Sequence, residues 1–300
     1  MRHNAFLGDS ISALGLGTLT WGQDTDDFEA REQIEIFLEA GGTIFDASEK
    51  FHPDSLQLLN SGLQDRARSD FQISLHFEVS ESRRDFLQRF SRSMDALGLE
   101  RIDYLVIEPI LNLGQWPRIA EEIQNLYSSQ VIDGVLFRNV AAWKSVRLQS
   151  YLPSHVYAGE HFNYSLLEAH NAERIEQVAS NGRKIIATAS LASGVLTGKY
   201  RSTVPADSRA ASPHLQDMTK RFFTPQNLAV VEAAEKAASG LGVSTSTIAL
   251  AWLQQQECVA SSIVGPRTAA QLRALLSDVD FQLPPAILEA LNDVAGIYQA

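Results

Sequence analysis

Short apolar runs alternate regularly with amphipathic helical segments along the whole chain, and this alternation limits the fold to a few α/β architectures. Eight of the runs have the length and composition of buried strands: 13–19, 43–46, 71–76, 103–108, 132–137, 156–160, 184–189 and 261–265. Buried parallel strands that alternate with helices form βα units, and eight such units predict a (β/α)₈ barrel in one domain over 1–300. A doubly wound open sheet is the rival fold, but no G-x-G-x-x-G loop opens a helix, which disfavours it.

Three further segments complete this expected architecture. Residues 6–15 predict a small hairpin that turns at Gly8 and Asp9 and closes the lower end of the barrel. The last amphipathic stretch, 284–298, predicts an extra helix outside the barrel. Residues 198–226 are polar and follow the seventh strand, which predicts a long loop over the carboxyl-terminal face, where barrels carry their active sites.

Charge and composition limit the classes of partner. The formal net charge of −11 at pH 7 argues against nucleic acid or an anionic membrane, because their phosphates would be repelled. The single cysteine, Cys258, excludes an intrachain disulfide and a multi-cysteine metal site. No apolar stretch is long enough for a signal-peptide core or a bilayer span, so we expect a cytoplasmic protein with a small-molecule substrate. None of these features favours a particular oligomeric state.

Five sequence motifs, taken in order along the chain, resemble those of one enzyme family. They are LGLGTLTWG at 14–22, SMDALGLERIDYLVI at 93–107, SLASGVLTGKY at 190–200, IALAWLQQQ at 248–256 and SSIVGPRTAAQL at 261–272. Together they make the chain similar to the aldo/keto reductase superfamily over nearly its full length. The resemblance implies a (β/α)₈ barrel that reduces carbonyl groups with NADPH. In that family a Tyr donates the proton, a Lys lowers the pKa of the Tyr, an Asp pairs with the Lys, and a His orients the substrate.

Position by position, most of the catalytic residues that the resemblance implies are replaced. Asp46 matches the family's Asp, but Phe51 stands at the Tyr position, His76 at the Lys position and Glu108 at the His position. A phenyl ring has no titratable proton. Losing a proton donor of this type costs on the order of 10²–10⁴ in rate. We therefore expect that the reductive mechanism of the family does not operate in this chain.

The resemblance also implies an NADP(H) site, whose two ends differ in this chain. Six residues match the family's phosphate and adenosine end: Gly194, Leu196, Gly198, Gly265, Arg267 and Gln271. At the nicotinamide end, Asn139 matches one carboxamide ligand, whereas Arg138 replaces its Ser partner and His161 replaces a Gln. Thr188 stands where an aromatic ring should stack on the nicotinamide. We expect this pocket to hold an anion on Arg267 but to bind NADP(H) poorly.

Without the resemblance, the barrel alone predicts a polar cluster, because it brings the ends of its strands to one rim. The residues at those ends are Asp46, His76, Glu108, Arg138, His161 and Thr188. Asp46 and His76, on neighbouring strands, predict a pair in which the carboxylate raises the basicity of the imidazole. Glu108 is a second candidate acid or base, and Arg138 is a candidate clamp for a carboxylate or phosphate.

Other side chains near this rim are expected to contact the substrate or an ion. Trp21 and Phe51, which follow the first two strands, are expected to line the substrate pocket with Arg138 and His161. Asp46, His76, Glu108 and His161 are also ligand types for a divalent metal. Their spacing forms no short metal-binding motif, so the sequence assigns no metal ligand.

Three functions follow as hypotheses. The first is acid–base chemistry without redox (dehydration, isomerisation, cyclisation or hydrolysis) on a small polar or anionic substrate, carried by Asp46, His76 and Glu108. The second is NADPH-dependent carbonyl reduction with an unusual proton donor: His76, His52 or a water. The third is a catalytically inactive pseudoenzyme that binds a ligand. The replaced residues Phe51, His76 and Glu108 motivate all three.

Overall fold

The computed structural model shows a closed barrel of eight parallel strands, in the order β10-β3-β4-β5-β6-β7-β8-β9. It describes residues 1–79, 82–108, 113–200, 203–206 and 208–296. The strands are β3 Leu14–Gly17, β4 Ile44–Ser48, β5 Gln72–Phe77, β6 Tyr104–Ile107, β7 Gly134–Arg138, β8 Tyr157–Asn163, β9 Lys184–Thr188 and β10 Val259–Val264. Pairing of β10 with β3 closes the sheet, which confirms the predicted barrel and excludes the open doubly wound sheet.

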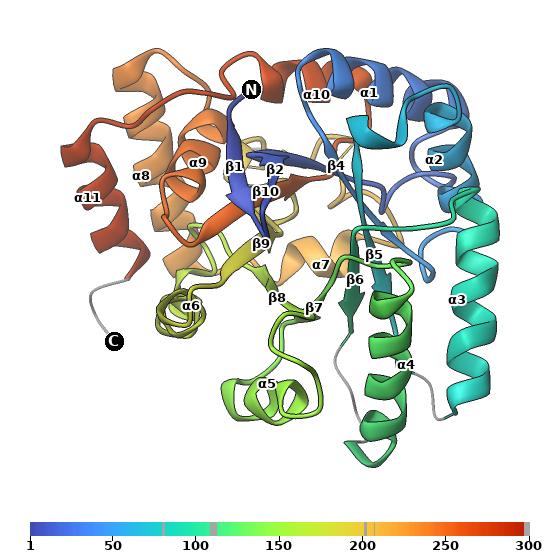
Figure 1. Ribbon diagram of the computed structural model, residues 1–300. Coiled ribbons are helices and arrows are strands. Elements are labelled where there is room, and N and C mark those ends of the chain that lie inside the picture. Colours follow the sequence, from blue (N-terminus) through green and yellow to red (C-terminus); the bar gives the residue numbers. More distant parts are fainter. Residues whose placement is uncertain (80–81, 109–112, 201–202, 207, 297–300) are drawn as a thin grey trace.

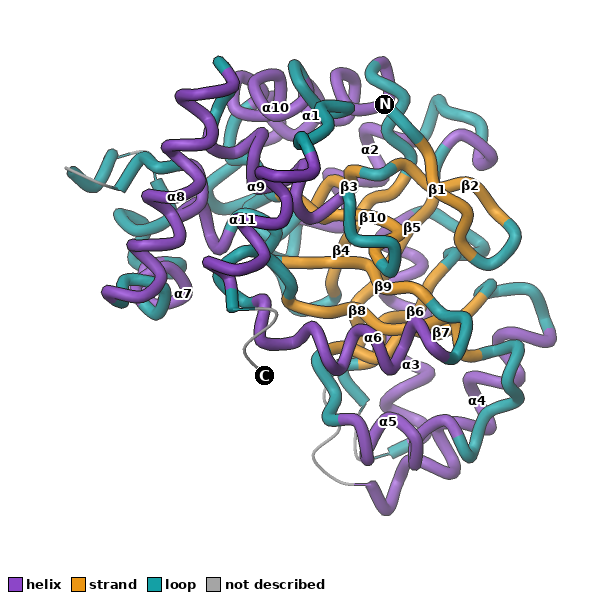
Figure 2. The backbone as a smooth tube through the Cα atoms, turned by 90° about the vertical axis from the view of Figure 1, so that its left-hand side faces the viewer, coloured by secondary structure: helices purple, strands orange, loops and turns teal. Residues whose placement is uncertain are grey.

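Helices surround the strands as the sequence periodicity predicts (Figures 1 and 2). They are α1 Asp27–Glu39, α2 Ser55–Leu63, α3 Arg83–Leu97, α4 Trp116–Ser128, α5 Ala142–Gln149, α6 Ala172–Ser180, α7 Gln216–Lys220, α8 Pro225–Leu241, α9 Thr245–Gln254, α10 Ala269–Leu276 and α11 Pro285–Ala295. Short 3₁₀ turns are η1 Arg68–Asp70, η2 Leu113–Gln115, η3 Ala169–Asn171 and η4 Ala192–Thr197. Local chemistry sets the helix ends: in α1, the Asp26 side chain accepts a hydrogen bond from the Glu29 amide.

The amino-terminal hairpin closes one end of the barrel, as predicted. It pairs β1 His3–Phe6 with β2 Asp9–Ser12. Leu7 and Gly8 form its turn with φ of 56° and 94°, the left-handed backbone that a tight hairpin needs. Phe6 and Ile11 are buried in one cluster with Tyr104 and residues near the amino ends of the other strands. The hairpin therefore covers the amino-terminal end of the barrel, opposite the carboxyl ends of the strands where the predicted polar residues lie.

The carboxyl-terminal segments also follow the prediction, with one correction. Helix α11 lies outside the barrel and packs against α8 (Figure 1). The stretch 198–226, expected to be a loop, contains the short helix α7 and the start of α8; its residues 201, 202 and 207 lie outside the described part. Pro225 at the first helical turn fixes where α8 begins. In the described residues, no helix is long and apolar enough to cross a membrane.

A glycine next to the irregular pairing of β7 and β8 gives a test of the fold. Gly159 has a φ of +151°, and a Cβ there would overlap the carbonyl oxygen of Lys184 on β9. Neither the backbone conformation nor the space admits a side chain. We expect Gly159→Ala to lower the free energy of unfolding by about 2–3 kcal/mol in urea denaturation.

Gly240 in α8 provides the matched control. A Cβ on Gly240 would meet nothing within 4 Å, and its backbone is helical. Gly240→Ala should therefore raise the free energy of unfolding by about 0.5–1 kcal/mol. Equal changes in the free energy of unfolding for the two substitutions would contradict the close approach of β8 to β9 at Gly159.

Candidate functional site

Three side chains from two strands meet on one carboxylate oxygen of a third strand inside the carboxyl-terminal end of the barrel. The Oδ1 atom of Asp46 on β4 lies 2.9 Å from Nε2 of His76 on β5 and 3.0 Å from Nε2 of His161 on β8. The hydroxyl of Ser74 donates a hydrogen bond to the same oxygen. Alternation along β5 places Ser74 and His76 on the same face, so both point into the barrel. All four side chains are buried.

A second carboxylate extends this cluster toward the rim. His76 Nδ1 lies 3.0 Å from the Oε1 atom of Glu108, which follows β6. The Nη1 atom of Arg138, at the end of β7, donates to the same Oε1 at 2.6 Å. Because each nitrogen of His76 faces a carboxylate, a doubly protonated imidazolium satisfies both contacts. The ring of Phe51 is tilted over this imidazole with its centroid 6.3 Å away.

The two carboxylates decide the charge state of His76. Burial alone disfavours the imidazolium, but attraction to Asp46 and hydrogen bonds to Asp46 and Glu108 outweigh it and raise the pKa of His76. Burial would likewise raise the pKa of Asp46, yet attraction to His76 and His161 holds it well below its usual range. In Glu108, burial is outweighed by the bonds from His76 and Arg138, which lower its pKa to about 2.

His161 has the opposite character. Complete burial dominates over its attraction to Asp46 and lowers the pKa of His161 to about 4. When His76 is protonated, the cluster pairs two carboxylates, Asp46 and Glu108, with two cations, His76 and Arg138, while burial disfavours a charge on His161. The network is compensated in charge although it is largely removed from water.

This cluster lies at one end of a cavity of about 790 Å³. Asp46, Phe51, His76 and Arg138 line one part of it, and the wall continues to the segment after β10. Nine residues that the sequence assigned to the site line the cavity: Asp46, Phe51, His76, Arg138, Thr188, Gly194, Gly265, Arg267 and Gln271. The structure therefore brings the expected substrate and cofactor residues to one continuous space.

Four of the predicted residues are placed elsewhere in the described structure. Trp21 was expected to line the pocket, but its side chain is fully buried in the core beside α1, where its indole nitrogen lies 3.4 Å from Gln33 Oε1. Leu196 is buried in the core around α8 and α9. Gly198 ends the η4 turn with a φ of 76°, facing Glu235. Asn139, which has a positive φ of 45°, lines a different cavity.

Glu108 and His161 belong to the cluster, but they are not among the described residues that line the cavity beside His76. Glu108 was expected to be a second acid or base, but its Oε1 atom is bound by His76 and Arg138. Its lowered pKa makes it a weak base, so its contacts make it a positioning residue. His161 is completely buried behind Asp46, which places it as a partner of the carboxylate and not as a substrate contact.

Several residues of the site were missed from the sequence. Ser74 donates to Asp46 and was identifiable by alternation, since it lies two residues before His76. Arg209 and Arg221, from the stretch over the carboxyl-terminal face, line the cavity together with Lys199. The Nη2 atom of Arg209 donates to the carbonyl oxygen of Gly265 at 2.6 Å. The long polar stretch indicated that this segment overhangs the site, but no pattern showed which of its residues point inward.

The charge of the cavity wall is strongly positive for a chain with a net charge of −11. Five basic residues line it, Arg138, Lys199, Arg209, Arg221 and Arg267, whereas Asp46 is the one acidic residue in the described lining. Three of these cations pair with carboxylates of the protein: Arg138 with Glu108, Arg221 with Glu168 and Arg267 with Asp24. Basic side chains still outnumber acidic ones in the described lining, which favours an anionic ligand.

The phosphate end of the cavity fits a dinucleotide better than the nicotinamide end does. The guanidinium of Arg209 lies beside Gly265, and Gln271 accepts from the backbone amide of Arg267, which also lines the cavity, at 2.9 Å; this setting suits phosphate oxygens. At the other end, Thr188 offers no ring to stack on a nicotinamide, and the guanidinium of Arg138 lines the same space. The residues present therefore fit the anionic part of NADP(H) and not its reactive ring.

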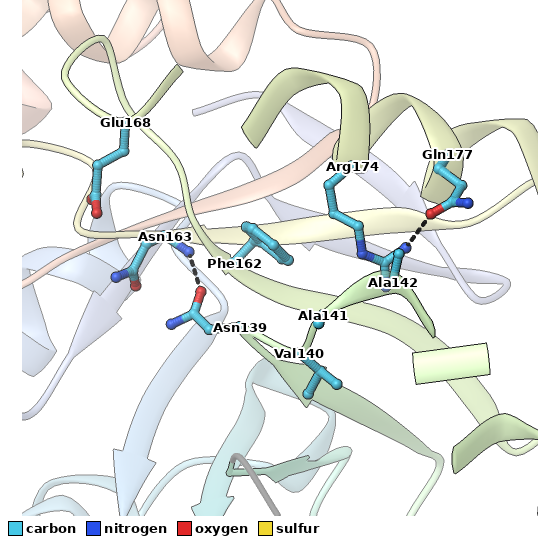
Figure 3. A pocket seen from close by; sticks show the side chains of 9 residues that line it. All are labelled: Asn139, Val140, Ala141, Ala142, Phe162, Asn163, Glu168, Arg174 and Gln177. Carbon is cyan, nitrogen blue, oxygen red and sulfur yellow. Dashed lines mark hydrogen bonds between the residues drawn. The ribbon is translucent and has the colours of Figure 1, made fainter. Parts of the chain in front are cut away.

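A second cavity, of about 850 Å³, lies between the β7–α5 connection and α6 (Figure 3). On one side of this cavity, the backbone N–H of Asn163 donates a hydrogen bond to Asn139 Oδ1 at 2.9 Å. On the other side, Arg174 Nη1 donates to Gln177 Oε1 at 3.0 Å. Arg174 also donates to Glu160 at 2.7 Å. Burial raises the pKa of Glu160 to about 7. This cavity shares Asn163 with the cavity beside His76 but lacks its cluster of strand-end residues.

The opposite character of the two histidines can be tested in metal-free protein. Imidazole ¹⁵N spectra recorded against pH should show His76 titrating above its ordinary pKa of about 6.5 and His161 titrating near pH 4. Glu108→Gln should lower the pKa of His76, because one stabilising carboxylate is lost. A higher folded-state pKa also means that charged His76 stabilises the fold below pH about 6.5 and loses this effect as pH rises through the folded value. Simultaneous titration of both rings would contradict this arrangement.

Comparisons with known proteins agree with the architecture. The model of the aldo/keto reductase family matches residues 13–295. An uncharacterized oxidoreductase from Bacillus subtilis is 24% identical over 96% of this chain and 93% of its own, and a probable voltage-gated potassium channel subunit beta from Oryza sativa is 24% identical over 98% and 94%. The solved structure of a glycerol dehydrogenase from Gluconobacter oxydans superimposes with a TM-score of 0.79 at 20% identity, covering 98% of this chain and 95% of that one. The chain belongs to the aldo/keto reductase family.

Proposed function

We propose that this protein is an enzyme of the family that moves protons on a small anionic substrate without redox chemistry. In this proposal His76 exchanges the proton, Asp46 and Glu108 orient its ring, and Arg138 binds the anionic group of the substrate. The observation that carries the proposal is the position of His76: it lines the cavity beside a guanidinium, with each ring nitrogen within 3.0 Å of a carboxylate. Dehydration, isomerisation, cyclisation and hydrolysis are the reaction classes that such a group can serve.

The contacts of Arg138 support the anionic class of substrate. Its Nη1 atom is engaged with Glu108, but the side chain remains 31% exposed and lines the cavity. The guanidinium can therefore donate a further hydrogen bond to a carboxylate or phosphate there. The other cations of the wall add to the same preference.

The phenyl ring of Phe51 favours chemistry without hydride transfer. Its centroid lies 6.3 Å from that of the His76 imidazole, at the position where the family resemblance implies a phenolic proton donor, and a phenyl ring offers no proton of its own. Proton exchange through an imidazole needs no phenol, because imidazole titrates near neutral pH.

Deuterium incorporation tests this proposal across several classes of substrate at once. A panel of small keto acids, hydroxy acids and sugar phosphates is incubated with the protein in D₂O without nicotinamide, and loss of C–H signal is followed by ¹H NMR. We expect exchange with at least one compound class. His76→Gln should slow it by roughly 10²–10⁴-fold, the usual contribution of a general acid or base.

Two further variants sharpen the exchange experiment. Arg138→Met should raise KM for the anionic compound far more than it lowers kcat, since it removes binding of the anionic group. His155→Gln, at an exposed histidine that packs on Tyr127 away from the cavity, should leave the exchange unchanged. Exchange that persists in His76→Gln would overturn the assignment of His76, and the absence of any turnover or exchange would favour a ligand-binding pseudoenzyme.

NADPH-dependent carbonyl reduction is the second candidate, favoured by the continuity of the cavity from His76 to Gly265, Arg267 and Gln271. The relatives include proteins named as oxidoreductases. Titration with NADPH by fluorescence separates the two candidates. The first predicts weak binding that Arg267→Ala reduces further, because only the phosphate end fits. Micromolar binding would favour the second candidate instead.

A further inference from the structure

The two buried histidines and Asp46 place three donor atoms in one small triangle. Its sides are 2.9 Å and 3.0 Å from Asp46 Oδ1 to the two Nε2 atoms, and 3.3 Å between Nε2 of His76 and Nε2 of His161. The imidazole rings are perpendicular, at 90°, with centroids 4.4 Å apart. Both rings therefore direct the same kind of atom toward one point beside the carboxylate.

This triangle has the dimensions of one face of a metal coordination sphere. Zinc and similar ions hold imidazole nitrogen and carboxylate oxygen at about 2.0–2.2 Å. Two such ligands are then separated by about 3.0 Å in octahedral geometry and about 3.4 Å in tetrahedral geometry. The three observed separations fall in or close to this range, so the ligands would need little movement.

Hydrogen bonds between protein groups alone do not satisfy all the polar atoms of this triangle. If both Nε2 atoms carry hydrogen, two N–H groups and the Ser74 hydroxyl all compete for Asp46 Oδ1. If His161 instead carries its hydrogen on Nδ1, that buried N–H has no partner in the described structure, and the lone pair of Nε2 faces an anionic oxygen. A cation between the three atoms would remove both conflicts at Nε2.

The surroundings of His76 match the outer shell of a metal ligand. Metal-binding histidines commonly donate their other ring N–H to a carboxylate, which fixes the tautomer and strengthens the metal bond. His76 Nδ1 meets Glu108 in this way at 3.0 Å, and Arg138 holds that carboxylate from the other side. Asp46 and His76 also line the 790 Å³ cavity, so the remaining coordination positions of an ion would face that cavity.

We infer that Asp46, His76 and His161 bind a divalent first-row transition metal ion through Oδ1, Nε2 and Nε2. Two histidines with one carboxylate form the ligand set used for zinc in hydrolytic sites and for Fe²⁺ in facial sites, both with positions left open for water or substrate. This inference rests on the proposed acid–base function, because the ion would hold the water that exchanges a proton with the substrate. With Nε2 bound to the ion, His76 would act as a ligand, and a water on the ion would face the cavity and take over the proton exchange assigned to His76 in the metal-free site, because bound water releases its proton near neutral pH.

Metal binding is measured directly, in the absence of any substrate. Protein stripped with EDTA is titrated with Co²⁺, Zn²⁺ and anaerobic Fe²⁺, followed by calorimetry and by the visible absorption of Co²⁺. We expect one ion per chain, no comparable binding of Ca²⁺ or Mg²⁺, and two imidazole ligands in the X-ray absorption spectrum of the zinc-loaded wild type. The spectrum needs no variant, so the test holds even if the variants fold poorly.

Variants then assign the ligands. Asp46→Asn and His161→Ala should each reduce affinity for Co²⁺ by more than the roughly 10–100-fold that loss of the outer-shell partner causes in Glu108→Gln. His155→Gln should bind the ion like the wild type. Binding in the wild type no tighter than in Asp46→Asn, or an ion without imidazole ligands, would overturn the inference.

The outcomes of this test are separable from those of the proposed function. Deuterium exchange that survives EDTA, together with absence of ion binding, would remove the metal site and leave the acid–base proposal standing. A bound ion with two imidazole ligands in a protein without any exchange would do the reverse. Exchange that EDTA abolishes and one equivalent of Zn²⁺ or Fe²⁺ restores is the expected result, and the ion that restores it identifies the working metal.

Discussion

The site depends on the convergence of three donors on Oδ1 of Asp46. Ser74 and His76 approach from β5, and His161 approaches from β8 on the other side of the barrel interior. A closed barrel is the architecture that allows this, because it turns strands distant in the sequence toward a common axis. The amino-terminal hairpin contributes by filling the opposite end with Phe6 and Ile11, so that polar groups gather at a single opening.

The charges around this oxygen form a chain that runs from the barrel interior to the cavity wall. Asp46, His76, Glu108 and Arg138 alternate in sign along hydrogen bonds of 2.9, 3.0 and 2.6 Å. Each ionised group therefore has a counter-charge in contact, which makes its burial tolerable. The chain connects a completely buried imidazole, His161, to a guanidinium that lines the cavity, so events at the ligand and at the buried end are linked through direct contacts.

Membership of the family fixes the barrel and leaves the chemistry to the residues at its rim. By its resemblance to the family, the chain carries Phe51 and His76 where reduction would need a phenol and an amine, and Arg138 and Thr188 line the same cavity. Arg267 and Gly265, which match the family's phosphate end, line it as well. These matches and replacements motivate the proposal of a site that binds anions without hydride transfer.

Local sequence patterns predicted most of the fold but only part of the site. Apolar runs predicted the strands because parallel strands are buried on both faces, and the residues ending those runs predicted Asp46, His76 and Arg138 at one rim. The contact between Asp46 and His161 spans 115 positions and depends on which way each strand faces, information that residue order does not carry. Trp21 was misplaced for a similar reason: α1 covers it, and a residue after a strand can turn outward to its helix as easily as inward.

NADPH consumption decides whether the rim residues support proton transfer in place of reduction. Wild-type protein and His76→Gln are compared over a panel of aldehydes and ketones at saturating NADPH. We expect the wild type to consume NADPH no faster than His76→Gln does. Consumption by the wild type that the substitution abolishes would refute proton transfer without reduction and would establish His76 as the proton donor of a reductase.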